Sequence, residues 1–191
     1  IFMNKNEVDF FYHATGDTEE TYDTMLAIIN DGAIKSKRLQ NKDLGQSLFN
    51  GDDYISVAAW DNSIDKDSSE FFLKSSFSGF VMGLPCFIIS GDIDAIKCEP
   101  YTGSYDSSKE RVSQYLDEWH VKDKIDLDKV VGIALPKEQH TEEEKETTRK
   151  ILECAKLYNW EVFVSDKNLV DSVRERFASI EKKKSRLIVR L

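Results

Sequence analysis

The chain gathers its most apolar residues into short runs that are rich in β-forming side chains and are separated by long polar stretches. Runs of this kind lie at Val8–Tyr12, Tyr54–Ala58, Cys86–Ile89, Val130–Leu135 and Trp160–Val164. Short runs of this composition, bounded by polar turns, are typical of β-strands. Two segments repeat apolar residues at helical spacing, so helices are expected between these strands.

Two capping boxes mark the expected helices. Asp17 with Glu20, and Thr141 with Glu144, each place a carboxylate three residues after a capping side chain. Apolar stripes at helical spacing follow them: Tyr22, Met25, Leu26 and Ile29 before Gly32 in the first helix, and Thr148, Ile151, Leu152, Ala155 and Tyr158 in the second. The second helix lies between two expected strands and predicts a crossover unit. A short helix is expected at Asp171–Phe177 and a closing strand at Leu187–Val189.

Length and charge limit the class of protein. With 191 residues, 40% of them hydrophobic, the chain is expected to form a single domain over 1–191, with a core at about 8–135 and a C-terminal α/β extension at about 136–191. A net charge of −9 disfavours a dedicated nucleic-acid binder. No apolar stretch approaches the ~20 residues that cross a bilayer, so no membrane partner is expected. The oligomeric state stays open.

The cysteines and histidines give no metal signature. Cys86, Cys98 and Cys154 are odd in number and lack a Cys-x-x-Cys pair. The three histidines are scattered along the chain. We therefore expect buried free thiols in a reducing compartment, such as a cytoplasm or a host cytosol, and no bound metal.

A long polar loop precedes a glutamate on an expected strand. The segment from Glu99 to Asp117 is rich in serine and tyrosine and lacks apolar periodicity. In the strand that follows, alternation places Glu118 and His120 on one face and Trp119 and Val121 on the other. The Glu118 carboxylate should therefore face away from the tryptophan.

Three sequence motifs, in this order along the chain, resemble the His-Tyr-Glu branch of the ADP-ribosyltransferase superfamily, which includes diphtheria toxin and the poly-ADP-ribose polymerases. His13-Ala14-Thr15 resembles the family's His-Gly-Ser/Thr strand end, and Asp53-Tyr54-Ile55-Ser56 its Gly-x-Tyr-Phe-like strand. Glu118-Trp119-His120-Val121 resembles its Glu-Tyr-x-Val strand. The resemblance spans about Phe10 to Leu135.

The resemblance implies an α+β fold, with a split β-sheet core, flanking helices and a C-terminal βαβ-like extension. It also implies a glycosyltransferase that uses NAD⁺ as its co-substrate, transfers ADP-ribose to a macromolecular acceptor and releases nicotinamide. The expected acceptor is a protein, and nucleic acid is the second possibility. Such a mono-ADP-ribosyltransferase would fit a bacterial toxin or effector. The implied catalytic residue is Glu118, and the implied cofactor-binding residues are His13, Ala14, Thr15, Tyr54 and Ser56. The acceptor loop would present Tyr101, Tyr105, Arg111 and Tyr115, with Arg111 or Arg38 as a partner of the pyrophosphate.

Two positions depart from the family pattern. Ala14 replaces a glycine whose backbone approaches nicotinamide. Leu116 stands two positions before Glu118, where arginine-modifying relatives carry Gln or Glu, so arginine is a less favoured acceptor. Ser56 would also suit the Arg-Ser-Glu branch, but no arginine stands at the position of His13.

Other functions fit parts of the same pattern. One is an inactive NAD-binding or protein-interaction module of the same fold, which the presence of Glu118 disfavours. An RNA 2′-phosphotransferase would need several His and Arg residues in place of the glutamate. An unrelated interaction module with a coincidental triad is the general alternative.

Overall fold

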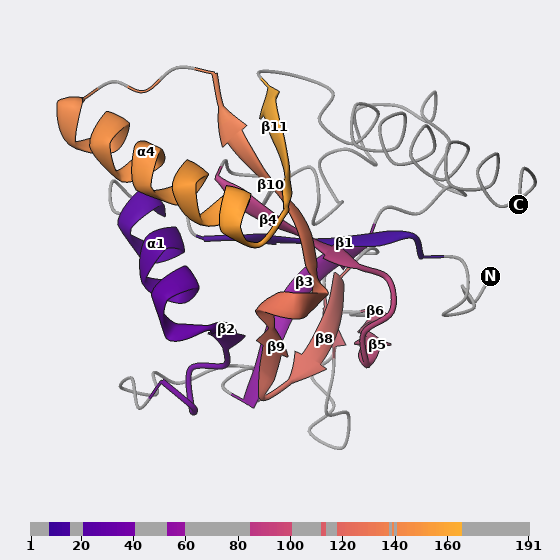
Figure 1. Cartoon of the computed structure of the whole chain (residues 1–191). Coiled ribbons are helices and arrows are strands. Elements are labelled where there is room, and N and C mark those ends of the chain that lie inside the picture. Colours follow the sequence, from indigo (N-terminus) through magenta and orange to yellow (C-terminus); the bar gives the residue numbers. More distant parts are fainter. Residues whose placement is uncertain are drawn as a thin grey trace, which may run out of the picture.

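One sheet organises the part of the chain that the computed structural model describes, which is residues 8–15, 21–40, 53–59, 85–100, 112–113, 118–137, 139 and 141–165. Its strand order is β11-β10-β4-β1-β3-β8-β5 (Figure 1). Neighbouring strands are antiparallel except β10 and β11. The strands are β1 (Phe10–Ala14), β3 (Tyr54–Ala59), β4 (Cys86–Ser90), β5 (Ala95–Lys97), β8 (Glu118–Lys122), β10 (Val130–Pro136) and β11 (Glu161–Ser165).

Two small ladders and three helical segments complete the described fold. β2 (Ala33–Lys35) pairs with β9 (Lys124–Asp126), and β6 (Glu99–Pro100) pairs with β7 (Val112–Ser113). The helices are α1 (Thr21–Asp31), α4 (Glu142–Leu157) and the short 3₁₀ turn η3 (Leu127–Lys129). This arrangement confirms the predicted α+β class. Neither α1 nor α4 has the length and apolar character that crossing a membrane requires.

Helices α1 and α4 lie side by side against one face of the sheet (Figure 1). Their buried side chains join those of the sheet in one cluster, which includes Met25, Ile29, Ile151 and Ala155 from the helices and Phe11, Val57, Phe87, Trp119 and Ile133 from the strands. The opposite face of the sheet carries a second, smaller buried cluster, Tyr12, Ala58, Cys86, Ile88 and Ala134. The two clusters follow the alternation of side chains along each strand.

The predicted crossover unit is confirmed. β10 leads into α4, and β11 returns parallel to β10. Gly132 allows this pairing, because a Cβ atom at this position would lie 2.8 Å from the Glu161 carbonyl oxygen. At the start of α4, the Thr141 hydroxyl accepts from the Glu144 N–H and the Glu144 carboxylate accepts from the Thr141 N–H, both at 3.1 Å. The predicted capping box is therefore present.

Several details differ from the sequence-based expectations. The strands β2, β5 and β9 have three residues each and carry too few alternating positions for a pattern to show. Tyr158, expected in the apolar stripe of the second helix, is 46% exposed and stacks on Trp160 after the helix has ended. The expected Asp17–Glu20 capping box, the Asp171–Phe177 helix and the Leu187–Val189 strand lie outside the described residues.

Replacing Thr141 by alanine is expected to lower the free energy of unfolding by about 1 kcal/mol, because the Glu144 N–H loses its side-chain acceptor. Urea denaturation followed by circular dichroism measures this loss. Thr141→Ser keeps the hydroxyl and should stay within about 0.5 kcal/mol of the native chain. Equal losses in the two variants would show that the threonine methyl group, not the cap, stabilises the helix.

Candidate functional site

Strand β8 presents Glu118 and His120 on the sheet face opposite the two helices. Its alternate residues Trp119 and Val121 belong to the buried cluster beneath the helices, and the Trp119 ring meets Phe11 edge-on with centroids 5.5 Å apart. Burial of the indole fixes which face of β8 is apolar. The predicted separation of the carboxylate from the tryptophan is therefore confirmed.

Pairing of β8 with β3 brings Ser56 and Tyr54 to the same face. Ser56 lies opposite His120 in the ladder, and its hydroxyl donates to Glu118 Oε1 at 2.8 Å. His120 Nε2 lies 3.2 Å from the same carboxylate oxygen. The Tyr54 ring stacks on the His120 ring with centroids 5.4 Å apart and planes inclined by 16°. Four side chains from two strands thus form one connected group, which we call the Glu118 cluster: Tyr54, Ser56, Glu118 and His120.

The Glu118 side chain is largely shielded from water, with 12% of it exposed. A carboxylate can only accept, so His120 donates its Nε2 hydrogen and its Nδ1 carries a lone pair when the ring is neutral. That Nδ1 atom is buried and has no hydrogen-bond partner among the described residues. An imidazole with one unpartnered buried nitrogen is uncommon in native proteins and calls for a physical explanation.

His13 approaches this group from the other side of β3. The ladder between β1 and β3 joins only Phe11 to Ala59 and Tyr12 to Ala58, so β1 and β3 are no longer paired at His13. At this point a side-chain hydrogen bond replaces the backbone pairing: His13 Nδ1 donates to the Ser56 carbonyl oxygen at 3.0 Å. Alternation along β1 places the His13 side chain on the face of Phe11, which is the helix-covered face opposite Glu118. Its connection to Glu118 therefore runs through Ser56.

Burial lowers the pKa of His13 below the ordinary value of 6.5, and the hydrogen bond to the Ser56 carbonyl opposes this shift only in part. The ring is therefore neutral at pH 7. Because Nδ1 carries the hydrogen, Nε2 is an acceptor that suits a hydroxyl group of a ligand.

The two residues after His13 contact β4 and the residue before it. Ala14 pairs with Cys86 of β4 and packs against the second buried cluster. The Thr15 hydroxyl donates to the Pro85 carbonyl at 3.2 Å, and the Thr15 N–H points to the same oxygen. These contacts hold the end of β1 next to Cys86, and a cofactor-binding role for Ala14 and Thr15 stays a prediction.

The structure describes only one of the residues expected to contact the pyrophosphate or the acceptor. Arg38 forms an ion pair with Asp53, the residue before Tyr54, and is exposed. Tyr101, Tyr105, Arg111 and Tyr115 lie outside the described residues. Within the predicted loop from Glu99 to Asp117, Glu99–Pro100 pairs in parallel with Val112–Ser113. This short ladder ties together two segments that the sequence analysis assigned to a single loop.

Sequence reasoning assigned no role to two members of the site. It did place His120 on the face of Glu118, and the structure confirms this. Cys98 had no usable signal, since its place opposite Glu118 depends on the pairing of β5 with β8. The Cys98 N–H donates to the Glu118 carbonyl at 3.0 Å, and the side chains of Cys98, Glu118 and His120 bring potential ligand atoms within 4.8 Å of one another.

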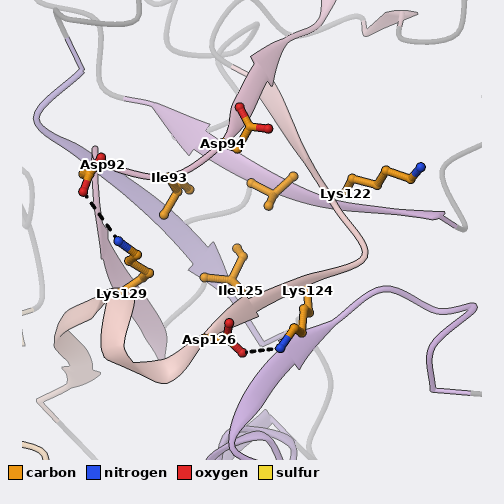
Figure 2. A pocket seen from close by; sticks show the side chains of 9 residues that line it. Asp92, Ile93, Asp94, Lys122, Lys124, Ile125, Asp126 and Lys129 are labelled. Carbon is orange, nitrogen blue, oxygen red and sulfur yellow. Dashed lines mark hydrogen bonds and ion pairs between the residues drawn. The ribbon is translucent and has the colours of Figure 1, made fainter.

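A hollow of about 430 Å³ lies away from the Glu118 cluster, along the turn before β5, the β8–β9 connection and η3 (Figure 2). Its apolar wall includes Val121, which points to the opposite face of β8 from Glu118. Two of its lysines are already paired with carboxylates, Lys129 with Asp92 and Lys124 with Asp126. The hollow is therefore neither part of the Glu118 cluster nor a concentrated patch of one charge.

Neither a protein-family model nor a curated protein matches the chain.

The lowered pKa of His13 predicts a pH dependence of stability. In the unfolded chain the imidazole takes up a proton near pH 6.5, whereas the folded protein resists protonation until a lower pH. The stabilisation is thus fully present above pH 6.5 and is lost as the pH falls towards the folded pKa. Urea denaturation across this range should show a steeper fall of the unfolding free energy for the native chain than for His13→Gln. Parallel curves would contradict a buried, neutral His13.

Proposed function

We propose that this protein is a mono-ADP-ribosyltransferase that breaks the bond between nicotinamide and ribose in NAD⁺ and transfers ADP-ribose to a macromolecular acceptor. The observation that carries the proposal is the placement of the three motif strands. β1 with His13, β3 with Tyr54 and β8 with Glu118 are consecutive neighbours in the sheet, although long segments separate them in the chain. The resemblance to the transferase family requires such a grouping.

The early end of the ladder between β1 and β3 supports the same proposal. Paired strands fill the space between them with hydrogen bonds, but this ladder ends after Tyr12 and Ala58. A site that binds a dinucleotide between two strands needs such a separation. A short ladder between β1, the strand with His13, and β3, the strand with Tyr54, is expected of a sheet core that splits between these two strands.

Glu118 supplies the chemistry in this proposal. As the C1′–N bond breaks, its electron pair leaves with nicotinamide and positive charge develops on the ribose. A preorganised carboxylate stabilises that charge. The acceptor then forms a bond to C1′, and its proton passes to Glu118 or to solvent. The hydrogen bonds from Ser56 and His120 hold one carboxylate oxygen, Oε1, in place, so the carboxylate needs little reorganisation during the reaction.

Tyr54 and His13 act in binding. The cationic nicotinamide ring would stack on the Tyr54 ring, a contact worth about 0.5–2 kcal/mol. His13 Nε2 would accept a hydrogen bond from a hydroxyl of the adenosine ribose. Ser56 is a positioning residue, because its hydroxyl holds Glu118 and its carbonyl holds His13.

The acceptor class follows from charge and from the residue before the glutamate. A net charge of −9 disfavours a polyanionic acceptor, so a protein is proposed. Leu116 in place of Gln or Glu disfavours arginine as the modified residue. A delivered toxin or effector is the biological role that we propose for such a transferase.

Glu118→Gln keeps the shape of the side chain and removes its charge. Nicotinamide release from NAD⁺ is expected to fall by at least about a hundredfold, the usual cost of losing a transition-state stabiliser. Chromatography of nicotinamide measures the rate, and circular dichroism checks the fold. The matched control is Glu143→Gln, an exposed position on α4, which should keep the full rate. A folded Glu118→Gln protein with unchanged turnover would refute the assignment.

Tyr54→Ala and His13→Ala are expected to weaken NAD⁺ binding by about 3-fold to 30-fold each, from the loss of one stacking contact or one hydrogen bond. Calorimetric titration measures the dissociation constants. Glu118→Gln should bind NAD⁺ almost as tightly as the native chain, since its role is in the transition state. Tyr158→Ala removes an exposed ring beyond α4 and serves as the control. Native affinity in both binding-site variants would place the cofactor elsewhere, and binding without turnover in the native chain would favour the inactive module.

A further inference from the structure

We propose that Cys98, Glu118 and His120 form a binding site for a thiophilic divalent cation. The chemistry of these ligands favours Zn²⁺. The site goes beyond the proposed transfer reaction, and its occupancy would withdraw Glu118 from that reaction. The ligands are the Cys98 thiolate, the Glu118 carboxylate and one ring nitrogen of His120, whose donor atoms already lie within 4.8 Å of one another.

Strand pairing holds these three side chains on one face. The ladder between β5 and β8 joins Ile96 to His120 and Lys97 to Trp119, and the Cys98 N–H continues it by donating to the Glu118 carbonyl at 3.0 Å. Cys98 therefore lies directly opposite Glu118, and His120 is two positions along the same strand. Side chains in such cross-strand and diagonal positions are within reach of a shared ion.

The ligand atoms lie within 4.8 Å of one another, a limit slightly longer than the spacing in a zinc site, so the side chains need to move only a little to bind the ion. In a tetrahedral zinc site the bonds are about 2.0–2.3 Å, which places neighbouring ligand atoms roughly 3.2–3.8 Å apart. Three protein ligands leave a fourth position for water or another small donor.

The donor set selects the class of metal. Thiolate and imidazole favour Zn²⁺ and related transition metals, whereas Mg²⁺ and Ca²⁺ prefer oxygen ligands. A thiolate and a carboxylate together neutralise a divalent ion, and a neutral imidazole adds no charge. This balance matters because Cys98 and His120 are each only 5% exposed and Glu118 only 12%.

His120 gives an independent reason to expect a ligand. Its side chain is buried, and Nδ1 has no hydrogen-bond partner among the described residues, while Nε2 faces the Glu118 carboxylate. A buried nitrogen lone pair without a partner costs free energy that coordination would recover. If Nδ1 is the ligand, Nε2 keeps its hydrogen and holds Glu118, as metal-bound histidines commonly hold a carboxylate. If Nε2 is the ligand, the hydrogen moves to Nδ1.

Titration of the full chain with Co²⁺, a spectroscopic substitute for Zn²⁺, tests the site. We expect one equivalent to bind with thiolate-to-cobalt charge-transfer absorption, and Zn²⁺ to displace it. Cys98→Ser should abolish that absorption, whereas Cys154→Ser, which removes a free cysteine on α4, should preserve it. His120→Gln keeps the thiol and should weaken binding by at least about a hundredfold, beyond the usual effect of an outer-shell partner.

Each outcome decides the proposal. Charge transfer that survives in Cys98→Ser, or that disappears in Cys154→Ser, would overturn the assigned ligands. Absence of any thiolate signal in the native chain, or native affinity in a folded His120→Gln protein, would overturn the site. Because absorption is read without NAD⁺, the result is independent of the proposed transferase activity. If both proposals hold, Zn²⁺ also suppresses nicotinamide release in the native chain, and less so in Cys98→Ser.

Discussion

Burial of Trp119 fixes the register on which the whole site depends. The indole lies beneath the helices against Phe11, and Val121 follows it into the same cluster. Because side chains alternate along a strand, a slip of one residue would bring Glu118 into the apolar core and expel the indole. Such a slip would combine the cost of burying a carboxylate with the loss of the aromatic contact. The apolar face of β8 therefore decides where its polar face points.

Ser56 joins the two sides of the site. Its hydroxyl donates to Glu118 and its carbonyl accepts from His13, so one residue of the middle strand touches both outer strands. The backbone contact is possible because the ladder between β1 and β3 has already ended. A fully paired ladder would occupy this space with main-chain hydrogen bonds. The early end of the ladder thus leaves the Ser56 carbonyl available to the His13 side chain.

The two proposed uses of Glu118 exclude each other. In the transfer reaction the carboxylate must offer its negative charge to the ribose, whereas in the metal site that charge is taken by the cation. Cys98 has no role in the transfer reaction, and His13 has none in metal binding. The two sets of residues share Glu118 and His120, so a metal would act as a competitor at the catalytic group rather than as a cofactor. Such an arrangement would make activity depend on the concentration of free metal.

The sequence by itself determined the elements that local chemistry specifies. The capping box at Thr141, the crossover unit around α4 and the separation of Glu118 from Trp119 all follow from short-range spacing. The shared face of Glu118 and His120 was predicted in the same way, from their spacing along the strand.

Only the tertiary structure decided which distant segments meet. Contact between Ser56 and Glu118, the carbonyl partner of His13 and the place of Cys98 all depend on strand order and register. Strand pairing joins residues far apart in the chain through main-chain hydrogen bonds that are the same for every side chain. Three-residue strands such as β5 carry almost no sequence pattern of their own. The pairing of β5 with β8, which places Cys98 opposite Glu118, could therefore not be predicted from the sequence.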